Sequence, residues 1–262
     1  MRKLSLFFAL LTLSAGLWAE TQKVSYLYPE YNTPNDPKSG IKEWKTGEVE
    51  ATVVEASSSV VYWGEHSQTT WYIVTDNITL SKGAVCHGAV HLILADGAKL
   101  TVTGLCDDDF TMCGAGIHIP YGVGYSFSVY GQTNQSGQLE AIACGYTAGI
   151  GGEYFKNGSN ITINGGVITA RSGDFCAGIG GGGHTGGNFS VNNSSNITIN
   201  GGTVTATGGK NSAGIGGGYG GSASNIIING GKVLPTEEIR VMVSVADMVV
   251  LALISLWLLI LS

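Results

Sequence analysis

Apolar and polar positions alternate in pairs of short blocks through the second half of the chain. In one such pair, Ile161 and Ile163 flank Thr162, and Ile168 and Ala170 follow with one residue between them. A period of two places every second side chain on the same face, as in a β-strand with one buried side. The pattern therefore predicts short strands, because the apolar positions of an amphipathic helix would recur every three or four residues.

The alternating blocks belong to an internal repeat that also contains glycine-rich motifs. The motif Ala-Gly-Ile-Gly-Gly occurs three times, at residues 148–152, 177–181 and 213–217. The motif Asn-Ile-Thr-Ile-Asn-Gly-Gly, with Ile for Thr in its last copy, occupies residues 160–166, 196–202 and 225–231. Two degenerate copies, at Leu92 and Phe127, complete a series with periods of 35, 34, 36 and 29 residues. Periods of this length predict a solenoid.

Each repeat contains three short strands separated by corners at which glycine can take a positive φ. Stacking each strand on its equivalent in the next repeat gives an all-β fold, a parallel β-helix of about five rungs with inward columns of Ile and Ala. We expect Asn164, Asn200 and Asn229 to stack as a hydrogen-bonded ladder inside this β-helix or at one of its corners.

The repeat motifs also resemble those of a known family. Ala-Gly-Ile-Gly-Gly-Gly, followed by Asn-Ile-Thr-Ile-Asn-Gly-Gly-Thr-Val-Thr-Ala-Thr-Gly-Gly, is similar to the glycine-rich repeat of secreted bacterial parallel β-helix surface proteins, which are often described as carbohydrate-binding. The stretch from His91 to Val102 resembles the rungs that precede that repeat, so the resemblance covers roughly residues 71–233. It implies a right-handed parallel β-helix, and it implies little about activity because the shared motif is scaffold.

The two ends of the chain have the composition of targeting segments. Met1, Arg2 and Lys3 precede an apolar run, and a small residue follows at Ala19, which predicts a signal peptide over residues 1–19 and an exported protein. The last segment, residues 235–262, contains a stretch that is apolar apart from three polar side chains and is long enough to cross a bilayer as a helix. We interpret this tail as a candidate transmembrane helix that would attach the protein to a membrane.

Two further segments lie between these ends. Residues 71–234 contain the predicted β-helix, and residues 20–70 are expected to cap its first rung, since an open rung exposes unpaired backbone and apolar side chains. Within the capping segment, Tyr26, Tyr28 and Tyr31 lie close to three prolines. This composition is typical of a surface loop.

Composition narrows the classes of partner. The chain has 41 glycines, only 12% charged residues and a formal net charge of −6. A nucleic-acid partner is excluded on this balance, because binding the phosphate backbone requires a cluster of Lys and Arg. The five cysteines cannot all pair within one chain, and Cys106 and Cys113 could form a disulfide bond in an exported protein.

An acidic triplet, Asp107, Asp108 and Asp109, lies between those two cysteines. Adjacent carboxylates on a loop could bind Ca²⁺, which takes oxygen ligands in flexible geometry, although a solvated acidic loop has the same composition. Arg171 follows the corresponding inward Ala two rungs later. Parallel β-helix polysaccharide lyases combine Ca²⁺-bound acids with a basic residue, so a lyase or hydrolase that uses the triplet with Arg171 is an alternative function.

A more regular feature is a series of aromatic residues in the loops that follow each Ala-Gly-Ile segment. The series consists of Tyr121, Tyr125, Tyr154, Phe155, Phe189 and Tyr219. In a β-helix these loops project from one corner, so the rings would form a ridge on which the faces of sugars could stack, unless they only cover the core. We therefore predict a non-catalytic surface protein that binds a polysaccharide, a surface glycan or matrix. A structural or adhesive spacer without a ligand is the third interpretation.

Overall fold

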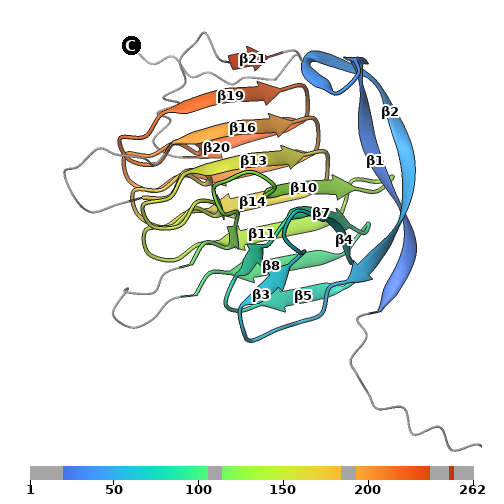
Figure 1. The fold of residues 1–262 in the computed structure, drawn as a ribbon, viewed down its shortest axis with the longest axis horizontal. Coiled ribbons are helices and arrows are strands. Elements are labelled where there is room, and N and C mark those ends of the chain that lie inside the picture. Colours follow the sequence, from blue (N-terminus) through green and yellow to red (C-terminus); the bar gives the residue numbers. More distant parts are fainter. Residues whose placement is uncertain (1–19, 106–113, 184–192, 237–247, 251–262) are drawn as a thin grey trace, which may run out of the picture.

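The computed structural model describes residues 20–105, 114–183, 193–236 and 248–250 of the 262-residue chain. The predicted signal peptide, residues 1–19, lies outside these ranges. Every regular element within them is a strand, so the described residues contain no helix of the length and apolarity needed to cross a membrane. The strands stack into a parallel β-helix, shown from the side in Figure 1.

Each rung of the β-helix contains one strand from each of three sheets. Sheet 1 contains β3 (Val61–Trp63), β6 (Ala84–Cys86), β9 (Ile117–His118), β12 (Ile150–Gly151), β15 (Ile179–Gly180) and β18 (Ile215–Gly216). Sheet 2 contains β4 (Thr69–Val74), β7 (Ala89–Leu94), β10 (Ser126–Gly131), β13 (Gly158–Ile163), β16 (Ser194–Ile199) and β19 (Ala223–Ile228). Sheet 3 contains β5 (Asn77–Leu80), β8 (Lys99–Thr103), β11 (Gln138–Ile142), β14 (Val167–Arg171), β17 (Thr203–Thr207) and β20 (Lys232–Thr236).

The described residues form six rungs, whereas the repeats predict about five. The additional rung is the first one, β3 to β5, which lacks the glycine-rich motifs and begins at Val61. In the later rungs the repeats pair in the expected register, with Ile161 opposite Ile197 and Ala170 opposite Ala206. Side chains at these positions are completely buried, so the predicted alternation of inward and outward residues is confirmed.

The predicted asparagine ladder is also confirmed, at the corner between sheets 2 and 3. Asn200 donates from Nδ2 to Oδ1 of Asn164 at 2.8 Å, and Asn229 donates from Nδ2 to Oδ1 of Asn200 at 2.8 Å. All three residues are buried. A second ladder, which we did not predict, connects the side chains of Asn160, Asn196 and Asn225.

Glycine is required at two positions of the repeat, one at a corner and one in sheet 1. Gly166, Gly202 and Gly231 follow the buried asparagines with φ of +85°, +85° and +88°, as the Asn-Gly-Gly motif predicts. Gly151 and Gly180, in sheet 1, have φ of +139° and +133°, and a Cβ at either position would overlap the carbonyl oxygen of the next rung. A residue with a side chain is strained in this region of φ, so the repeat requires glycine there.

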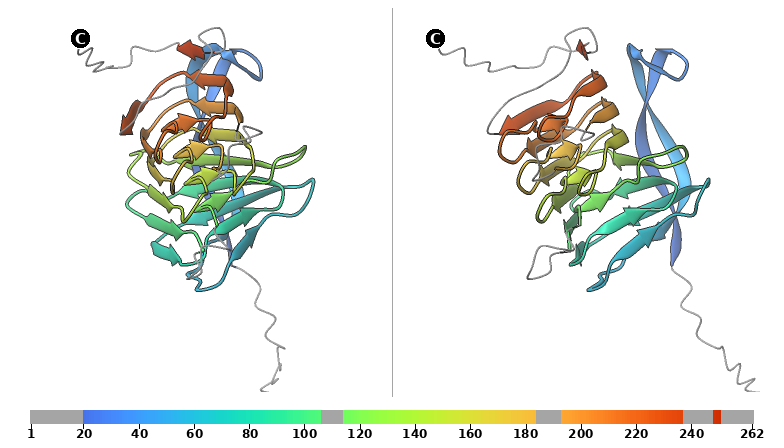
Figure 2. Two further views of the ribbon diagram at one scale, coloured as in Figure 1. Left: turned by 90° about the vertical axis from the view of Figure 1, so that its left-hand side faces the viewer. Right: turned by 60° about the vertical axis from the view of Figure 1, so that its left-hand side comes forward.

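The segment before the first rung is a long antiparallel hairpin formed by β1 (Thr21–Thr33) and β2 (Asp36–Val53). The end of β2 pairs with β4, which joins the hairpin to the first rung of sheet 2. The hairpin, blue in Figures 1 and 2, runs along the outer side of the β-helix toward the later rungs. Tyr26 contacts Trp71 and Tyr130, with ring centroids 4.6 Å and 5.1 Å apart. The expectation of a surface loop around Tyr26 is therefore wrong.

Little of the apolar tail falls within the described residues. Residues 235 and 236 complete β20, and Met248–Val250 form the strand β21, which pairs in parallel with β19 at the end of sheet 2. The prediction of a helix is therefore wrong for residues 248–250. The rest of the predicted membrane anchor, residues 237–247 and 251–262, lies outside the described ranges.

Candidate functional site

The outer face of sheet 1 changes character halfway along the β-helix. In the first three rungs, Tyr62, Val85 and His118 occupy equivalent outward positions on β3, β6 and β9. In the next three rungs the same position is glycine, and the equivalent residues are Gly151, Gly180 and Gly216. The loops that follow sheets 1 and 3 meet over this glycine half, where the amide of Gly183 donates to the Tyr146 carbonyl oxygen at 3.1 Å.

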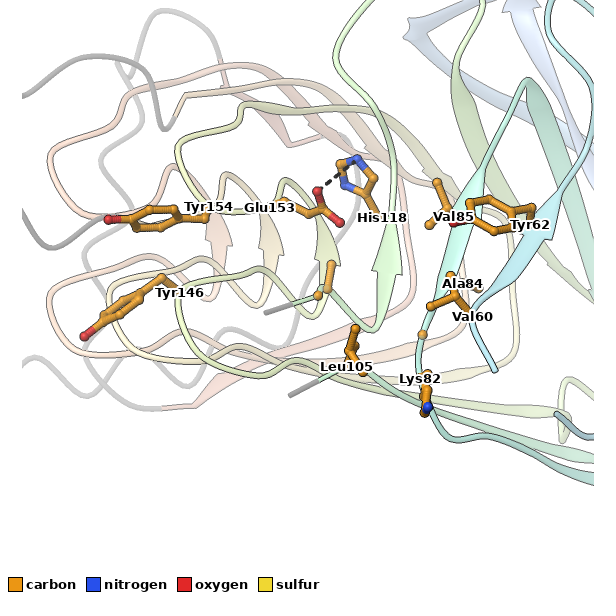
Figure 3. Close-up of a pocket in the computed structure, with 13 residues that line it drawn as sticks. Val60, Tyr62, Lys82, Ala84, Val85, Leu105, His118, Tyr146, Glu153 and Tyr154 are labelled. Carbon is orange, nitrogen blue, oxygen red and sulfur yellow. Dashed lines mark ion pairs between the residues drawn. The ribbon is translucent and has the colours of Figure 1, made fainter. Parts of the chain in front are cut away.

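A groove of about 560 Å³ lies where the two halves of sheet 1 meet. Its chemically distinctive lining residues are Tyr62, Lys82, His118, Tyr146, Glu153 and Tyr154. Figure 3 shows Glu153 and His118 between the Tyr146 and Tyr154 rings on one side and Tyr62 on the other. Short apolar side chains and backbone make up the rest of the lining. The groove therefore combines flat rings with a few polar groups, as binding sites for small or extended ligands do.

His118 and Glu153 are the polar pair of the groove. Nε2 of His118 lies 3.7 Å from Oε2 of Glu153, and Nδ1 of His118 lies 3.2 Å from the carbonyl oxygen of Gly151. Burial lowers the pKa of His118, and the Glu153 carboxylate offsets this in part. Lys156 and His87 lower the pKa of His118 further through their charges. The imidazole is consequently neutral at pH 7, because its ordinary pKa of about 6.5 already lies below that pH.

The rings at the groove continue along the later rungs as a contiguous set, here called the aromatic row, in which Tyr154 and Phe155 are exposed and the other three rings are half-buried. Its members are Phe155, Tyr154, Tyr146, Phe175 and Tyr219. Centroids of consecutive rings are 4.3, 5.8, 6.3 and 5.4 Å apart in that order. The row thus brings together three of the predicted ridge residues, namely Tyr154, Phe155 and Tyr219.

Two members of the aromatic row were missed by the sequence analysis. Tyr146 and Phe175 come from the loops after sheet 3, whereas the predicted ridge contains only residues from the loops after Ala-Gly-Ile. Each stands two residues before the Ala of an Ala-Gly-Ile segment, Ala148 and Ala177. Their shared position in the repeat is a signal that could have identified them.

The other predicted ridge residues have different surroundings. Tyr121 is 64% exposed in the loop after β9. Tyr125 is partly buried against the core, and its hydroxyl lies 3.1 Å from Nδ1 of His66. Phe189 lies outside the described residues. Tyr62, which the sequence did not single out, is 62% exposed and packs on His87 with ring centroids 4.9 Å apart.

The acidic triplet cannot be placed relative to this groove. Asp107, Asp108 and Asp109 lie outside the described residues, together with Cys106 and Cys113. Arg171 is exposed at the end of β14 and does not line the groove. Three other cysteines are described: Cys144 is disulfide-bonded, which the sequence did not indicate, and Cys86 and Cys176 are buried. The described residues contain no group of three or more His, Cys, Asp or Glu side chains that could hold a metal ion.

Comparison with known proteins gives one similarity. A family model described as a beta helix repeat matches residues 161–183 and 197–219. These segments overlap β13 to β15 and β16 to β18, and each set of three strands is one full turn of the β-helix. No curated protein and no solved structure matches the chain. Every residue that lines the groove lies outside the matched segments, so the match concerns the scaffold.

Proposed function

We propose that the protein is a non-catalytic glycan-binding module whose binding surface is the groove on sheet 1 together with the aromatic row. The observation that carries this proposal is the position of exposed Tyr62 and Tyr154 on opposite sides of a groove that also contains Lys82, His118 and Glu153. Sugar rings have apolar faces and polar edges, and a groove of this composition offers partners for both.

The elongated form of the site favours a chain of sugars over a single one. Ring contacts link Tyr154 to Tyr219, and these two residues come from loops two rungs apart. Successive rungs of parallel strands are about 4.8 Å apart, so the aromatic row extends along the axis of the β-helix. An extended polysaccharide or surface glycan could contact several of its rings at once.

The proposed absence of catalysis rests on the acids of the groove. Hydrolysis of a glycosidic bond commonly requires two carboxyl groups that flank the bond. Among the described residues that line the groove, Glu153 is the one carboxylate. We place the binding event outside the cell or at its surface, in keeping with the signal peptide expected at residues 1–19.

A polysaccharide panel tests this function. The full-length protein would be incubated with insoluble and soluble polysaccharides, with and without Ca²⁺, and both the retained protein and the released sugar would be measured. We expect retention without release. Released sugar would refute the proposal and favour the alternative, a polysaccharide-cleaving enzyme. If no polysaccharide in the panel retains the protein, the result would favour a structural or adhesive spacer without a ligand.

A pair of matched variants ties retention to the groove. Tyr154→Ala removes an exposed ring of the groove, and Trp44→Ala removes an equally exposed ring from the hairpin. Truncation of a central interface aromatic costs about 1–2 kcal/mol, so Tyr154→Ala should weaken binding about 5- to 30-fold. Trp44→Ala should bind as the unmodified protein does. Equal affinity for the two variants would contradict the assignment of the site.

A further inference from the structure

His118 and Glu153 each present a hydrogen-bond acceptor to the other, namely Nε2 of His118 and Oε2 of Glu153. The Gly151 carbonyl oxygen can only accept a hydrogen bond, so Nδ1 of His118, 3.2 Å away, carries the ring proton and donates it. In the neutral imidazole, Nε2 then carries a lone pair and can only accept a hydrogen bond. Nε2 lies 3.7 Å from Oε2 of Glu153. This distance is too long for a direct hydrogen bond, and neither atom has a proton to donate to the other.

The two acceptors open into the groove. His118 and Glu153 both line it, and the Glu153 side chain is 38% exposed. In the described part of the chain, no other side chain forms an ion pair with the Glu153 carboxylate. The pair is therefore a place for a ligand that brings donors, since buried or half-buried acceptors are favourable only when they are hydrogen-bonded.

The charged side chains around the His118–Glu153 pair restrict which hydrogen-bond donors of a ligand can bind there. Among the described lining residues, Lys82 and Glu153 are the two charged side chains, one of each sign. A uronate group would bring its negative charge close to Glu153, and an amino sugar would bring a positive charge into a groove that already contains Lys82 and is close to Lys156. Hydroxyl groups donate without adding charge.

We propose that the groove selects neutral glycans, through two adjacent hydroxyl groups that donate to His118 Nε2 and to the Glu153 carboxylate. This inference rests on the proposed function, to which it adds the class of sugar. The aromatic row contacts the faces of the sugars, and the His118–Glu153 pair determines which sugars bind. The arrangement also makes binding depend on pH, because a proton on Nε2 removes that acceptor and gives His118 a positive charge that pairs with the Glu153 carboxylate 3.7 Å away.

Titration calorimetry with the full-length protein tests the class of sugar. The ligands would be oligosaccharides of cellulose, xylan and mannan as neutral probes, chitosan oligosaccharides as amine-bearing probes, and oligogalacturonate as the acidic probe. We expect at least one neutral probe to bind more tightly than both charged probes. Affinity for that probe should fall as the pH is lowered through the depressed pKa of His118, whose surrounding charged groups are Glu153, Lys156 and His87.

Two substitutions separate the acceptors from the rings. Glu153→Gln replaces the carboxylate by an amide of the same shape and should weaken binding of the neutral probe about 10- to 100-fold. His118→Asn keeps a donor for the Gly151 carbonyl but lacks Nε2, so it should weaken binding about 3- to 10-fold and abolish the pH dependence. The control is Glu140→Gln, whose carboxylate pairs with Lys99 on sheet 3 at 2.7 Å, and it should bind normally.

The outcomes distinguish this inference from the proposed function. If Tyr154→Ala weakens binding but Glu153→Gln and His118→Asn do not, the inference is wrong and the glycan-binding function stands. Tighter binding of oligogalacturonate or chitosan oligosaccharides than of every neutral probe also overturns the inference. If the unmodified protein binds none of the probes, the proposed function and this inference fail together. Unchanged thermal unfolding of the variants would show that the fold is intact.

Discussion

Replacing Asn200 by alanine tests whether the buried asparagine ladder holds the later rungs together. The Asn200 side chain uses all of its hydrogen-bonding groups. Its Nδ2 donates to Asn164 Oδ1 and to the Tyr31 hydroxyl, both at 2.8 Å, and its Oδ1 accepts from Asn229 at 2.8 Å. Alanine at this position removes the partners of the Asn164 oxygen and the Asn229 amide, in a corner where both residues are buried.

The expected loss of stability follows from the groups that are left unpaired. A buried polar group without a partner costs about 1–3 kcal/mol, and Asn200→Ala creates two of them. The free energy of unfolding should therefore fall by about 4 kcal/mol. Asn229→Ala is the matched comparison, because Asn229 makes one ladder bond and its own Oδ1 is already buried without a partner among the described residues. Its cost should be about 1 kcal/mol.

Guanidinium unfolding, monitored by tryptophan fluorescence and by circular dichroism, measures both variants. A shift of the midpoint at an unchanged slope reports the change in stability directly. Equal losses of unfolding free energy for Asn200→Ala and Asn229→Ala would refute the reasoning. The middle residue of the ladder would then contribute no more to stability than the end residue. A loss below about 1 kcal/mol for Asn200→Ala would refute it as well.

Three further predictions concern the scaffold. Gly180→Ala, whose Cβ would overlap the Gly216 carbonyl oxygen, should lower the free energy of unfolding by about 2–4 kcal/mol, whereas Gly97→Ala, which has a φ of +83° but nothing near its Cβ, should cost about 1 kcal/mol. Burial lowers the pKa of His91 to about 4, so the buried neutral imidazole contributes fully to stability above about pH 6.5, and this contribution is lost as the pH falls toward 4. Thermal unfolding at a series of pH values should show that His91→Gln flattens this part of the stability profile. Tyr26→Ala removes the ring that packs on Trp71 and should make the hairpin the first site of cleavage in limited proteolysis, while Tyr62→Ala should leave the cleavage pattern unchanged.

The repeated rungs could be predicted from the sequence because each rung repeats the same physical solution. Ile161 and Ile197 stack in register, and Asn164 and Asn200 form the ladder, so the sequence period and the structural period are the same. The first rung could not be found in this way. Val61 begins a strand whose burial depends on Trp63 and not on the Ile and Gly of the later copies.

The hairpin was missed because proline was taken as a sign of a loop. Pro29 lies within β1, which is the outermost strand of its sheet. An edge strand has one row of backbone groups that no neighbour pairs with, and a residue without an N–H is tolerated there. The aromatic side chains Tyr26 and Tyr28 then have a different role from the one the composition indicated, because they pack between the hairpin and the outer face of sheet 2.

The candidate site could be predicted only where it follows the repeat. Tyr154 and Tyr219 were identified because their loops recur, whereas Tyr62 and His118 occupy a strand position that glycine holds in every perfect copy. Glycine at that position is required by its positive φ and by the close approach of the next rung, so the perfect repeats cannot present a side chain there. The degenerate rungs do not have this requirement and present Tyr62, Val85 and His118 at the same position. The groove lies where these rungs meet the glycine-containing rungs. Functional side chains in such a solenoid should therefore be sought first in the degenerate rungs. In the regular rungs, the glycines that allow close stacking place no side chain on the outer face of sheet 1.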